Sequence, residues 1–582
     1  MNTLLSLLLP ALAALALLLG PTASHAAPAG LPRKAAVPSP ADVVFLNGKI
    51  VTLDTKGSVV SAVAIRNGRF VAVGTDSAVR KLAGKGTRIV DLDGKTVVPG
   101  LIDAHCHPAP TMVFTQAVDA RAPGVPTVAK VLLNIEERVK VTPKGDWVVV
   151  VGSSASQTKF LEKRLPSRAE LDRAAPENPV WFWNGTHAEV LNSKGLAALG
   201  ISKGNLKLPH GGRVEVDANG EPTGQMFEGE ANVPFVPDAK TVVGWFAKDI
   251  PALWNARGFT TVNGMLALDE AAALRAVARS GTRPTIRYSH FVFAEPNGVG
   301  MPADLSVLAM PAGTSTDDFK TTGIKLWIDG EVDAGSGFCK DPYADPTGVP
   351  DGGRGLLVTT EAQATDFARR ARAAGLGVAL HASCDASSEI AVRALRTVAR
   401  EGGKPTLQRM DHYGQFVGPT PEVSKAVKEL GIHVVTQPAW LLFLGKSTLD
   451  LLGEERTATA WRYRSMVKAG LKPAGSSDTT GAYLEASNPF VHMKAAVTRR
   501  SDMGIVQPEE ALSVADALRM WTLWGARAIG EERSRGSIEK GKLADMTVLT
   551  EDLFTIPPER IDQVRAAQTI VGGEVVYRAD PG

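Results

Sequence analysis

A repeated unit of helix, glycine and short strand is the feature that most constrains the fold of this chain. Four helical stretches in its later half are followed by Gly375, Gly402, Gly431 and Gly470, and each glycine precedes a short apolar run. The helical stretches span residues 361–374, 388–401, 421–430 and 461–469, and the apolar runs span 378–380, 406–410, 432–435 and 471–474. Glycine suits the left-handed conformation in which many helices end. The alternation, which begins after about residue 254, predicts βα units around a parallel sheet.

Polar and ionisable residues come directly after these predicted strands. In chain order they are His381, Asp411-His412, Gln437-Pro438 and Ser477-Asp478. An earlier apolar run, residues 324–328, carries Lys325 and has Asp329 and Glu331 beside it. In barrels of alternating β and α elements the active site lies at the C-terminal ends of the strands. The sequence therefore predicts a functional site built from these strand ends.

A pair of histidines follows another apolar run, residues 97–102. His105 and His107 are two residues apart, so on a strand both imidazoles lie on one face and can bind one ion. Imidazole is a common ligand of zinc and similar metals. Many pairs of this kind are only polar side chains at a strand edge, so the metal interpretation depends on the other strand ends.

The two ends of the chain have a different pattern, with short apolar runs separated by turn residues in place of βα units. Asn47-Gly48, Asn67-Gly68 and Asp93-Gly94 are hairpin signals within short apolar runs, and similar runs return at residues 546–549, 569–571 and 574–577. We expect residues 42–96 and 536–582 to form one small β-sandwich, and residues 97–535 to form the barrel. Between about residues 147 and 230 the βα rhythm is lost, which predicts an insertion packed over the barrel mouth.

The N-terminal segment favours export. Residues 4–19 are almost unbroken apolar, and Ser24-His25-Ala26 resembles a signal-peptide cleavage site. We expect a signal peptide at residues 1–26, a flexible leader at 27–41 and a periplasmic or secreted protein. An uncleaved membrane anchor is the alternative. A net charge of +3, without a basic tract, argues against a nucleic-acid partner.

The cysteines are too few for a disulfide framework. The chain has three, Cys106, Cys339 and Cys384. A bridge between Cys339 and Cys384 is conceivable, and free thiols are the default expectation.

Several motifs together resemble the amidohydrolase superfamily, in particular its third family, which includes N-substituted formamide deformylases. The resemblance runs from residue 42 to residue 577. Its motifs are P-G-L-I-D-A-H-C-H at 99–107, K-L-W-I-D-G at 325–330, H-A-S-C-D at 381–385, R-M-D-H at 409–412 and G-S-S-D at 475–478. Further matches are L-D-R-A-A-P-E-N-P-V at 171–180, G-E-P-T-G at 220–224, N-P-F at 488–490 and G-S-I-E-K-G-K-L-A-D at 536–545.

This resemblance implies a (β/α)8 barrel of the TIM type with a metal centre at its mouth. His105 and His107 would bind one ion, His381 and His412 a second, and a carboxylated Lys325 would bridge them. Asp478 would be both a ligand and the general acid/base. His187 aligns with a histidine near the substrate, with a core histidine as the alternative. The chain departs from the family at Cys384, often glycine, and at Asp411, often glutamate, which puts substrate choice and the surroundings of the ligands in doubt.

The expected function is that of an exported, metal-dependent amidohydrolase that cleaves a small-molecule, non-peptide amide with a metal-activated water. The expected cofactor is a divalent metal, zinc first, as one or two ions. Hydrolysis of esters, lactones or cyclic amides is an alternative, because the same centre attacks any activated carbonyl. A periplasmic ligand-binding protein without catalysis is an alternative of another class. The sequence specifies neither the substrate nor the oligomeric state.

Overall fold

The structure is a computed structural model that describes residues 39–580, except 186, 209–211, 230–232, 234–236, 294–300, 347–348, 405 and 480–482. The chain divides into two units, Met1–Ser39 and Pro40–Gly582. The expected signal peptide, and the expected leader up to residue 38, lie outside the described residues. Of the helices in the described part, none is both long and apolar enough to cross a membrane.

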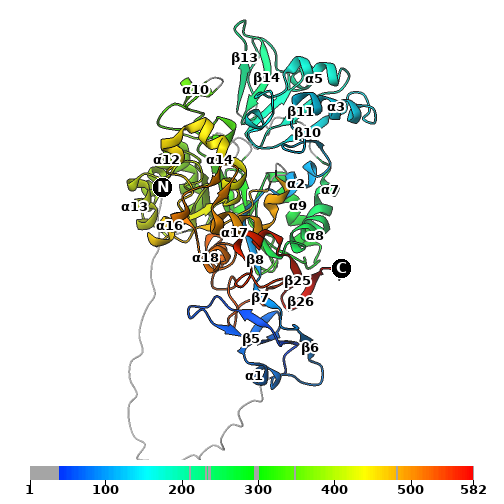
Figure 1. Cartoon of the computed structure of the whole chain (residues 1–582), viewed down its shortest axis with the longest axis vertical. Coiled ribbons are helices and arrows are strands. Elements are labelled where there is room, and N and C mark those ends of the chain that lie inside the picture. Colours follow the sequence, from blue (N-terminus) through cyan, green and yellow to red (C-terminus); the bar gives the residue numbers. More distant parts are fainter. Residues whose placement is uncertain are drawn as a thin grey trace, which may run out of the picture. The chain divides into compact units, whose positions relative to one another are not determined.

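Eight parallel strands form the central sheet of the second unit (Figure 1). In sheet order they are β21 (Ala474–Gly475), β20 (His433–Thr436), β19 (Gln408–Asp411), β18 (Gly377–His381), β17 (Phe319–Trp327), β16 (Arg287–Phe293), β15 (Phe259–Leu266) and β8 (Leu101–Cys106). The two end strands contact each other, and the backbone N–H of Asp478 donates to the carbonyl of His105 at 2.9 Å. The sheet thus closes into a barrel, which confirms the predicted (β/α)8 fold.

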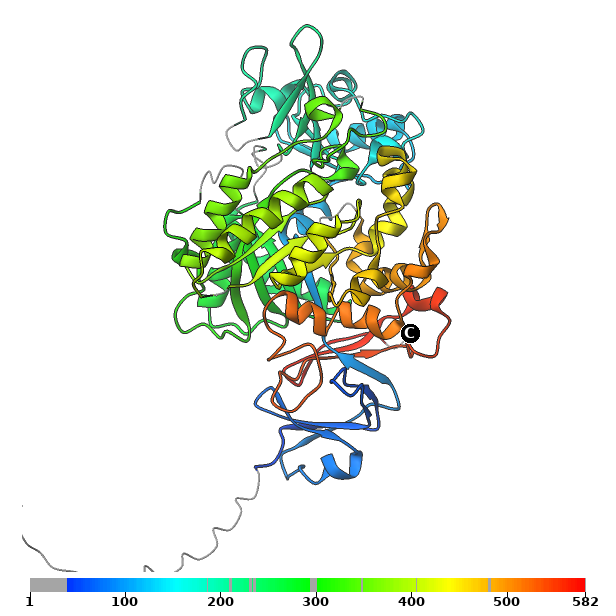
Figure 2. The same cartoon turned by 90° about the vertical axis from the view of Figure 1, so that its left-hand side faces the viewer.

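Helices that follow β15 lie on the outside of these strands (Figure 2). They include α9 (Leu268–Arg279), α11 (Glu361–Ala373), α12 (Asp385–Arg400), α13 (Pro421–Glu429), α14 (Ala439–Leu452), α16 (Tyr463–Lys468), α17 (Pro489–Thr498), α18 (Val514–Met520) and α19 (Leu523–Ala528). Gly375, Gly402, Gly431 and Gly470 have φ values of 72°, 73°, 65° and 86°, the left-handed conformation expected of them. The last predicted strand was placed too early, because only Ala474 and Gly475 pair with β20.

Two further sheets share one buried cluster, and the second of them combines strands from both ends of the described chain. One has the order β5 (Arg69–Gly74), β4 (Ala62–Arg66), β1 (Val43–Leu46), β6 (Arg88–Asp91). The other has the order β26 (Glu574–Arg578), β25 (Ala566–Val571), β24 (Met546–Leu549), β7 (Thr96–Pro99), β2 (Lys49–Val51), β3 (Val59–Val60). Phe45, Val63, Val97, Met546 and Ile570 belong to one buried cluster between them. This confirms the predicted β-sandwich.

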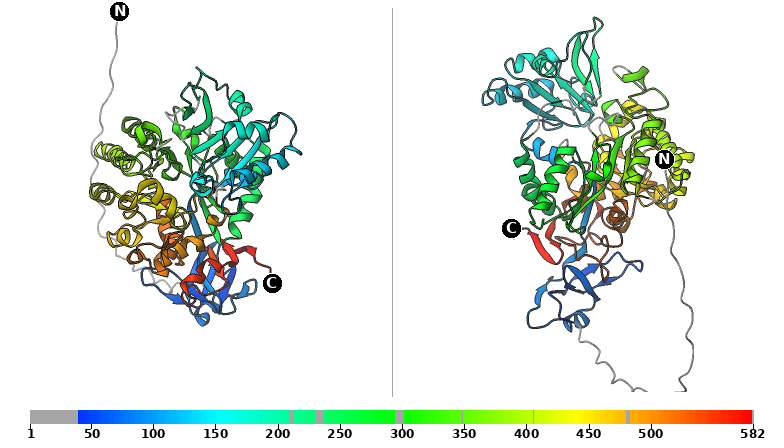
Figure 3. Two further views of the ribbon diagram at one scale, coloured as in Figure 1. Left: turned by 45° about the horizontal axis from the view of Figure 1, so that its top comes forward. Right: turned by 180° about the vertical axis from the view of Figure 1, so that it is seen from behind.

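A six-stranded mixed sheet interrupts the βα alternation after β8. Its order is β13 (Arg213–Val216), β14 (Pro222–Phe227), β12 (Ala188–Leu191), β11 (Val180–Trp183), β10 (Val148–Gly152), β9 (Val118–Ala120). The helices α3 (Val128–Val139) and α5 (Arg168–Ala174) pack on it, and Figure 3 shows the described residues of this segment in blue to cyan-green. Ser154 and His187 from this segment line a cavity together with barrel strand ends, so the insertion covers the barrel mouth. The sheet starts before residue 147, at β9.

A disulfide bond joins Cys339 to Cys384. It ties the loop after β17 to the N-terminus of α12, directly after β18. The default expectation of free thiols is therefore wrong for these two residues. The two cysteines are 45 residues apart in the sequence, and only the folded barrel brings their Cα atoms to 5.2 Å. Cys106 is free and buried.

Candidate metal centre

Five of the predicted site residues lie at the ends of barrel strands. His105 is on β8 and His107 directly follows it, His381 ends β18, His412 follows β19, and Asp478 lies three residues after β21. All four histidines are buried, and all five side chains line one cavity. The closed parallel sheet is what gathers them, because the carboxyl ends of its strands meet at one mouth.

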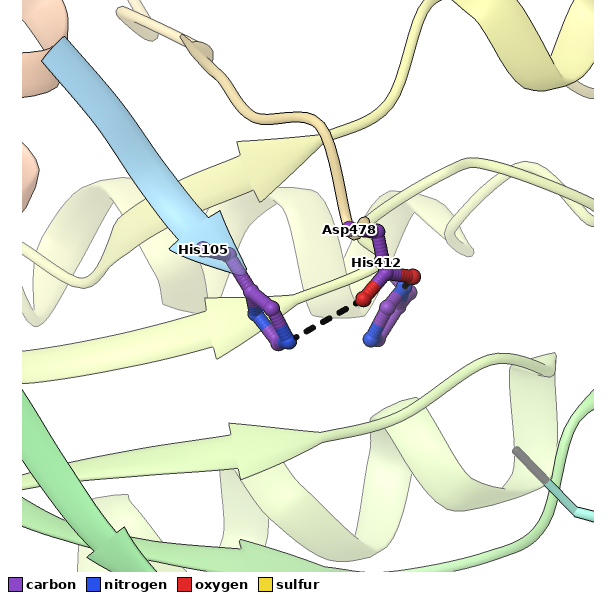
Figure 4. A group of neighbouring side chains, drawn as sticks. All are labelled: His105, His412 and Asp478. Atoms are coloured by element: carbon purple, nitrogen blue, oxygen red, sulfur yellow. Dashed lines mark ion pairs between the residues drawn. The ribbon is translucent and has the colours of Figure 1, made fainter. Parts of the chain in front are cut away.

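Asp478 is the centre of a first group of candidate ligands (Figure 4). Its Oδ1 lies 3.3 Å from Nε2 of His105 and 3.4 Å from Nε2 of His107, and its Oδ2 lies 3.8 Å from Nδ1 of His412. His412 and Asp478 have φ values of 63° and 49°. Non-glycine residues rarely adopt this conformation, and such strain is frequent at functional sites. The backbone is held so that both side chains meet at one point.

Lys325 lies beside this group, in the interior of the barrel. Its side chain is fully buried, and Nζ donates a hydrogen bond to Oδ2 of Asp411 at 2.5 Å. Asp411 also lies 2.7 Å from Nε of Arg409 and 2.9 Å from Nδ1 of His105. Burial lowers the pKa of Lys325, and the neighbouring Asp411 opposes that shift. In this structure Lys325, which was predicted as a bridging ligand, is an unmodified amine paired with the carboxylate of Asp411.

A second group of candidate ligands consists of His187, Glu331 and His381, which offer one ligand atom each within 4.8 Å of one another. Oε2 of Glu331 lies 3.4 Å from Nε2 of His381 and 3.8 Å from Nε2 of His187. Nδ1 of His187 contacts Oε2 of Glu228 at 2.7 Å. The sequence placed Glu331 beside the lysine strand without giving it a role, and nothing in it pointed to Glu228.

The cavity between the two groups is small and mixed in character. Trp327, Phe416, Trp440 and Leu444 supply apolar walls, and Asp333 adds another carboxylate. Its volume of about 20 Å³ is enough for a water molecule.

The protonation states of His105, His412 and Asp478 suit metal binding. Burial, together with the charge of Lys325, lowers the pKa of His105 to about 3 and that of His412 to about 4, so both are neutral near pH 7. Burial raises the pKa of Asp478, but His105 and His412 more than offset this and hold it below its usual value. Neutral imidazoles and an ionised carboxylate are the forms that bind divalent metals. In addition, the buried Oε1 of Glu331 has no hydrogen-bond partner within the described residues. The donor set fits a metal ion.

The model of the amidohydrolase family matches residues 88–577 of the sequence. The chain belongs to the amidohydrolase family. This amidohydrolase is therefore a metal-dependent hydrolase that acts on carbon–nitrogen bonds other than peptide bonds.

A protein of similar sequence agrees with this assignment, and two solved structures share the fold. The chain is 29% identical to the N-substituted formamide deformylase of Arthrobacter pascens over 92% of its own length and 98% of that protein, which confirms the predicted resemblance. A metal-dependent hydrolase of Pyrococcus horikoshii has the same fold, with a TM-score of 0.68, 22% identity, and 89% of this chain and 99% of that chain covered. An adenosine deaminase of Xanthomonas campestris with bound zinc aligns with a TM-score of 0.51 and 16% identity over 93% of this chain and 94% of that one.

Proposed function

We propose that this amidohydrolase is exported and cleaves a non-peptide amide bond of a small molecule, with Asp478 as the general acid/base. The observation that carries the proposal is the position of Asp478, whose carboxylate meets His105, His107 and His412 at the cavity. The relative from Arthrobacter pascens, a formamide deformylase by name, supports an amide as the substrate class.

The residues of the first group suit hydrolysis by water. A divalent cation held by His105, His107, His412 and Asp478 would lower the pKa of water and polarise the scissile carbonyl. Asp478 accepts the proton of the attacking water at a carboxylate oxygen and donates it to the departing nitrogen. His187 faces the same cavity and is placed to contact the substrate carbonyl. The apolar walls exclude bulk water and strengthen these interactions.

Zinc is the ion that we propose first, because imidazole and carboxylate are its common ligands in catalytic sites. A carboxylated Lys325 would add an anionic oxygen, and its formation requires the contact with Asp411 to give way. Lys325→Ala should then abolish activity and remove at least one metal ion per chain, as measured by elemental analysis. Full activity with full metal content would exclude the bridging lysine.

Two features support export. The apolar segment at residues 4–19 precedes a cleavage-site pattern, and the Cys339–Cys384 bond is of a kind that persists mainly in oxidising compartments. N-terminal sequencing of protein recovered from the periplasm or medium should begin at residue 27. An intact Met1 on protein in the membrane fraction would instead indicate an anchor.

The substrate class is tested with the zinc-loaded enzyme on a panel of N-formyl, N-acyl and cyclic amides and esters. We expect turnover of open-chain amides that is lost in Asp478→Asn. Turnover limited to esters, lactones or cyclic amides would instead identify the protein as a hydrolase of those compounds. Stoichiometric metal without any turnover would favour a ligand-binding protein.

A further inference from the structure

Glu331 occupies an unusual position for a buried carboxylate. Only 7% of the residue is exposed, and it lines the cavity. Within the described residues its ion pairs are with His187 and His381, and no lysine or arginine pairs with it. Its second oxygen, Oε1, is buried without a hydrogen-bond partner among those residues. A buried carboxylate in such a setting is costly unless a cation or a proton compensates it.

His187 is held in the way that metal-binding histidines usually are. Nδ1 contacts the buried carboxylate of Glu228 at 2.7 Å, and this contact turns Nε2 toward Glu331. Metal-ligating histidines commonly bind the ion with one ring nitrogen and donate to a carboxylate with the other. Glu228 is itself fixed, since Oγ of Ser336 donates to its Oε1 at 3.1 Å.

The loop that carries Glu331 is fixed on both sides. The backbone N–H of Glu331 donates to Oγ of Ser336 at 3.0 Å. Farther along, the Cys339–Cys384 bond anchors the loop beside the strand that ends at His381. Nε2 of His381 lies 3.1 Å from the carbonyl oxygen of Gly330, and binding a cation through this nitrogen would replace that contact. The three side chains are thus positioned by separate supports, as a binding site requires.

We infer that His187, Glu331 and His381 bind a divalent cation separate from the one held by the Asp478 group. Glu331 supplies the negative charge, the two imidazoles supply neutral nitrogen ligands, and Glu228 orients His187. The inference rests on the proposed function in that both ions would face one substrate cavity. The inference gives His381 the partners Glu331 and His187 in place of His412. It assigns Nε2 of His187 to the cation instead of to the substrate carbonyl, and it does not need a modified lysine.

The test is a count of zinc ions per chain. The full-length protein is stripped with a chelator, reloaded with zinc, dialysed and measured by elemental analysis. We expect two equivalents in the wild type and one in Glu331→Gln. Asp333→Asn is the matched control, because it removes another buried carboxylate of the same cavity that belongs to neither group, and it should keep two.

Reciprocal variants separate the two sites. Asp478→Asn should lose one equivalent, and the double variant with Glu331→Gln should lose both. Glu331→Gln with wild-type zinc content overturns the inference. A single equivalent in the wild type, lost alike in both single variants, also overturns it. If circular dichroism shows that Glu331→Gln is unfolded, His187→Asn removes a second ligand without touching the loop. If folded His187→Asn keeps the wild-type zinc content, the inferred second cation site is likewise contradicted.

The count does not depend on the reaction. Two equivalents that respond as expected, without amide turnover, would support the second cation and contradict the proposed function. Amide turnover together with an unchanged zinc content in Glu331→Gln would support the proposed function and contradict the second cation.

Discussion

The two groups of candidate ligands at the barrel mouth are built from different parts of the chain. His105, His107, His412 and Asp478 lie on barrel strands or within three residues of their ends, and a backbone hydrogen bond of 2.9 Å joins Asp478 to His105. In the second group only His381 ends a strand. His187 lies between β11 and β12 of the inserted sheet, and Glu331 lies in the loop after β17.

This difference separates what the barrel fixes from what its additions can vary. Strand ends in a closed sheet are held by the ladder of hydrogen bonds, so the first group keeps its geometry as long as the barrel is folded. The second group depends on Glu228, Ser336 and the Cys339–Cys384 bond to bring three separate segments together. Function is often changed through such loops while the scaffold stays the same.

The largest expected effect tests whether the first group carries the chemistry. Asp478→Asn should lower kcat by roughly 10²–10⁴-fold, because it removes the proton-transferring carboxylate. The measurement is steady-state hydrolysis of whichever amide the wild type turns over. Glu485→Gln, which removes an exposed carboxylate nearby in the chain, should keep wild-type kcat. Equal activity of Asp478→Asn and wild type would remove Asp478 from the mechanism.

The division between ligands at strand ends and ligands on loops also explains which site residues could be predicted from the sequence. Repeated units of helix, glycine and strand were enough to predict the barrel, and the first group followed because its residues stand at predicted strand ends. Glu331 was noted only as a neighbour of Lys325, because its orientation depends on the path of a loop. His187 rested on resemblance alone, and Glu228 had no signal, because the pairing of β12 with β14 is a long-range property.

The disulfide should affect the second group more than the first. Replacing Cys339 and Cys384 together by serine removes a cross-link between residues 45 apart, which is worth about 2–4 kcal/mol of unfolding free energy. Denaturant unfolding measures the loss. We expect the zinc equivalent that depends on Glu331 to dissociate more readily and the one that depends on Asp478 to stay.

A reducing agent provides the control for that variant. It should lower the unfolding midpoint of the wild type and leave the midpoint of the double serine variant unchanged. If both midpoints fall alike, the destabilisation does not come from this bond.

Glu228→Gln should weaken only the second group. The carboxylate orients His187 from 2.7 Å, and loss of such a partner typically costs 10–100-fold in metal affinity. Zinc titration against a competing chelator should show one site weakened by that factor and one unchanged. Equal weakening of both sites would mean that the groups bind as one centre.

The smallest effect is expected from Gln437, a hydrogen-bonding neighbour of His412 in the first group. Oε1 of Gln437 lies 3.2 Å from Nδ1 of His412, and its amide nitrogen donates to Oγ of Ser476 at 2.7 Å. A neutral hydrogen bond contributes about 1 kcal/mol, so Gln437→Ala should weaken the Asp478-dependent site about fivefold and spare the other. The same chelator titration measures it. Because His412 is also held at a strand end, this loss should be smaller than that in Glu228→Gln. A larger loss would show that the barrel alone does not fix the first group, and that both groups depend on side-chain supports to a similar degree.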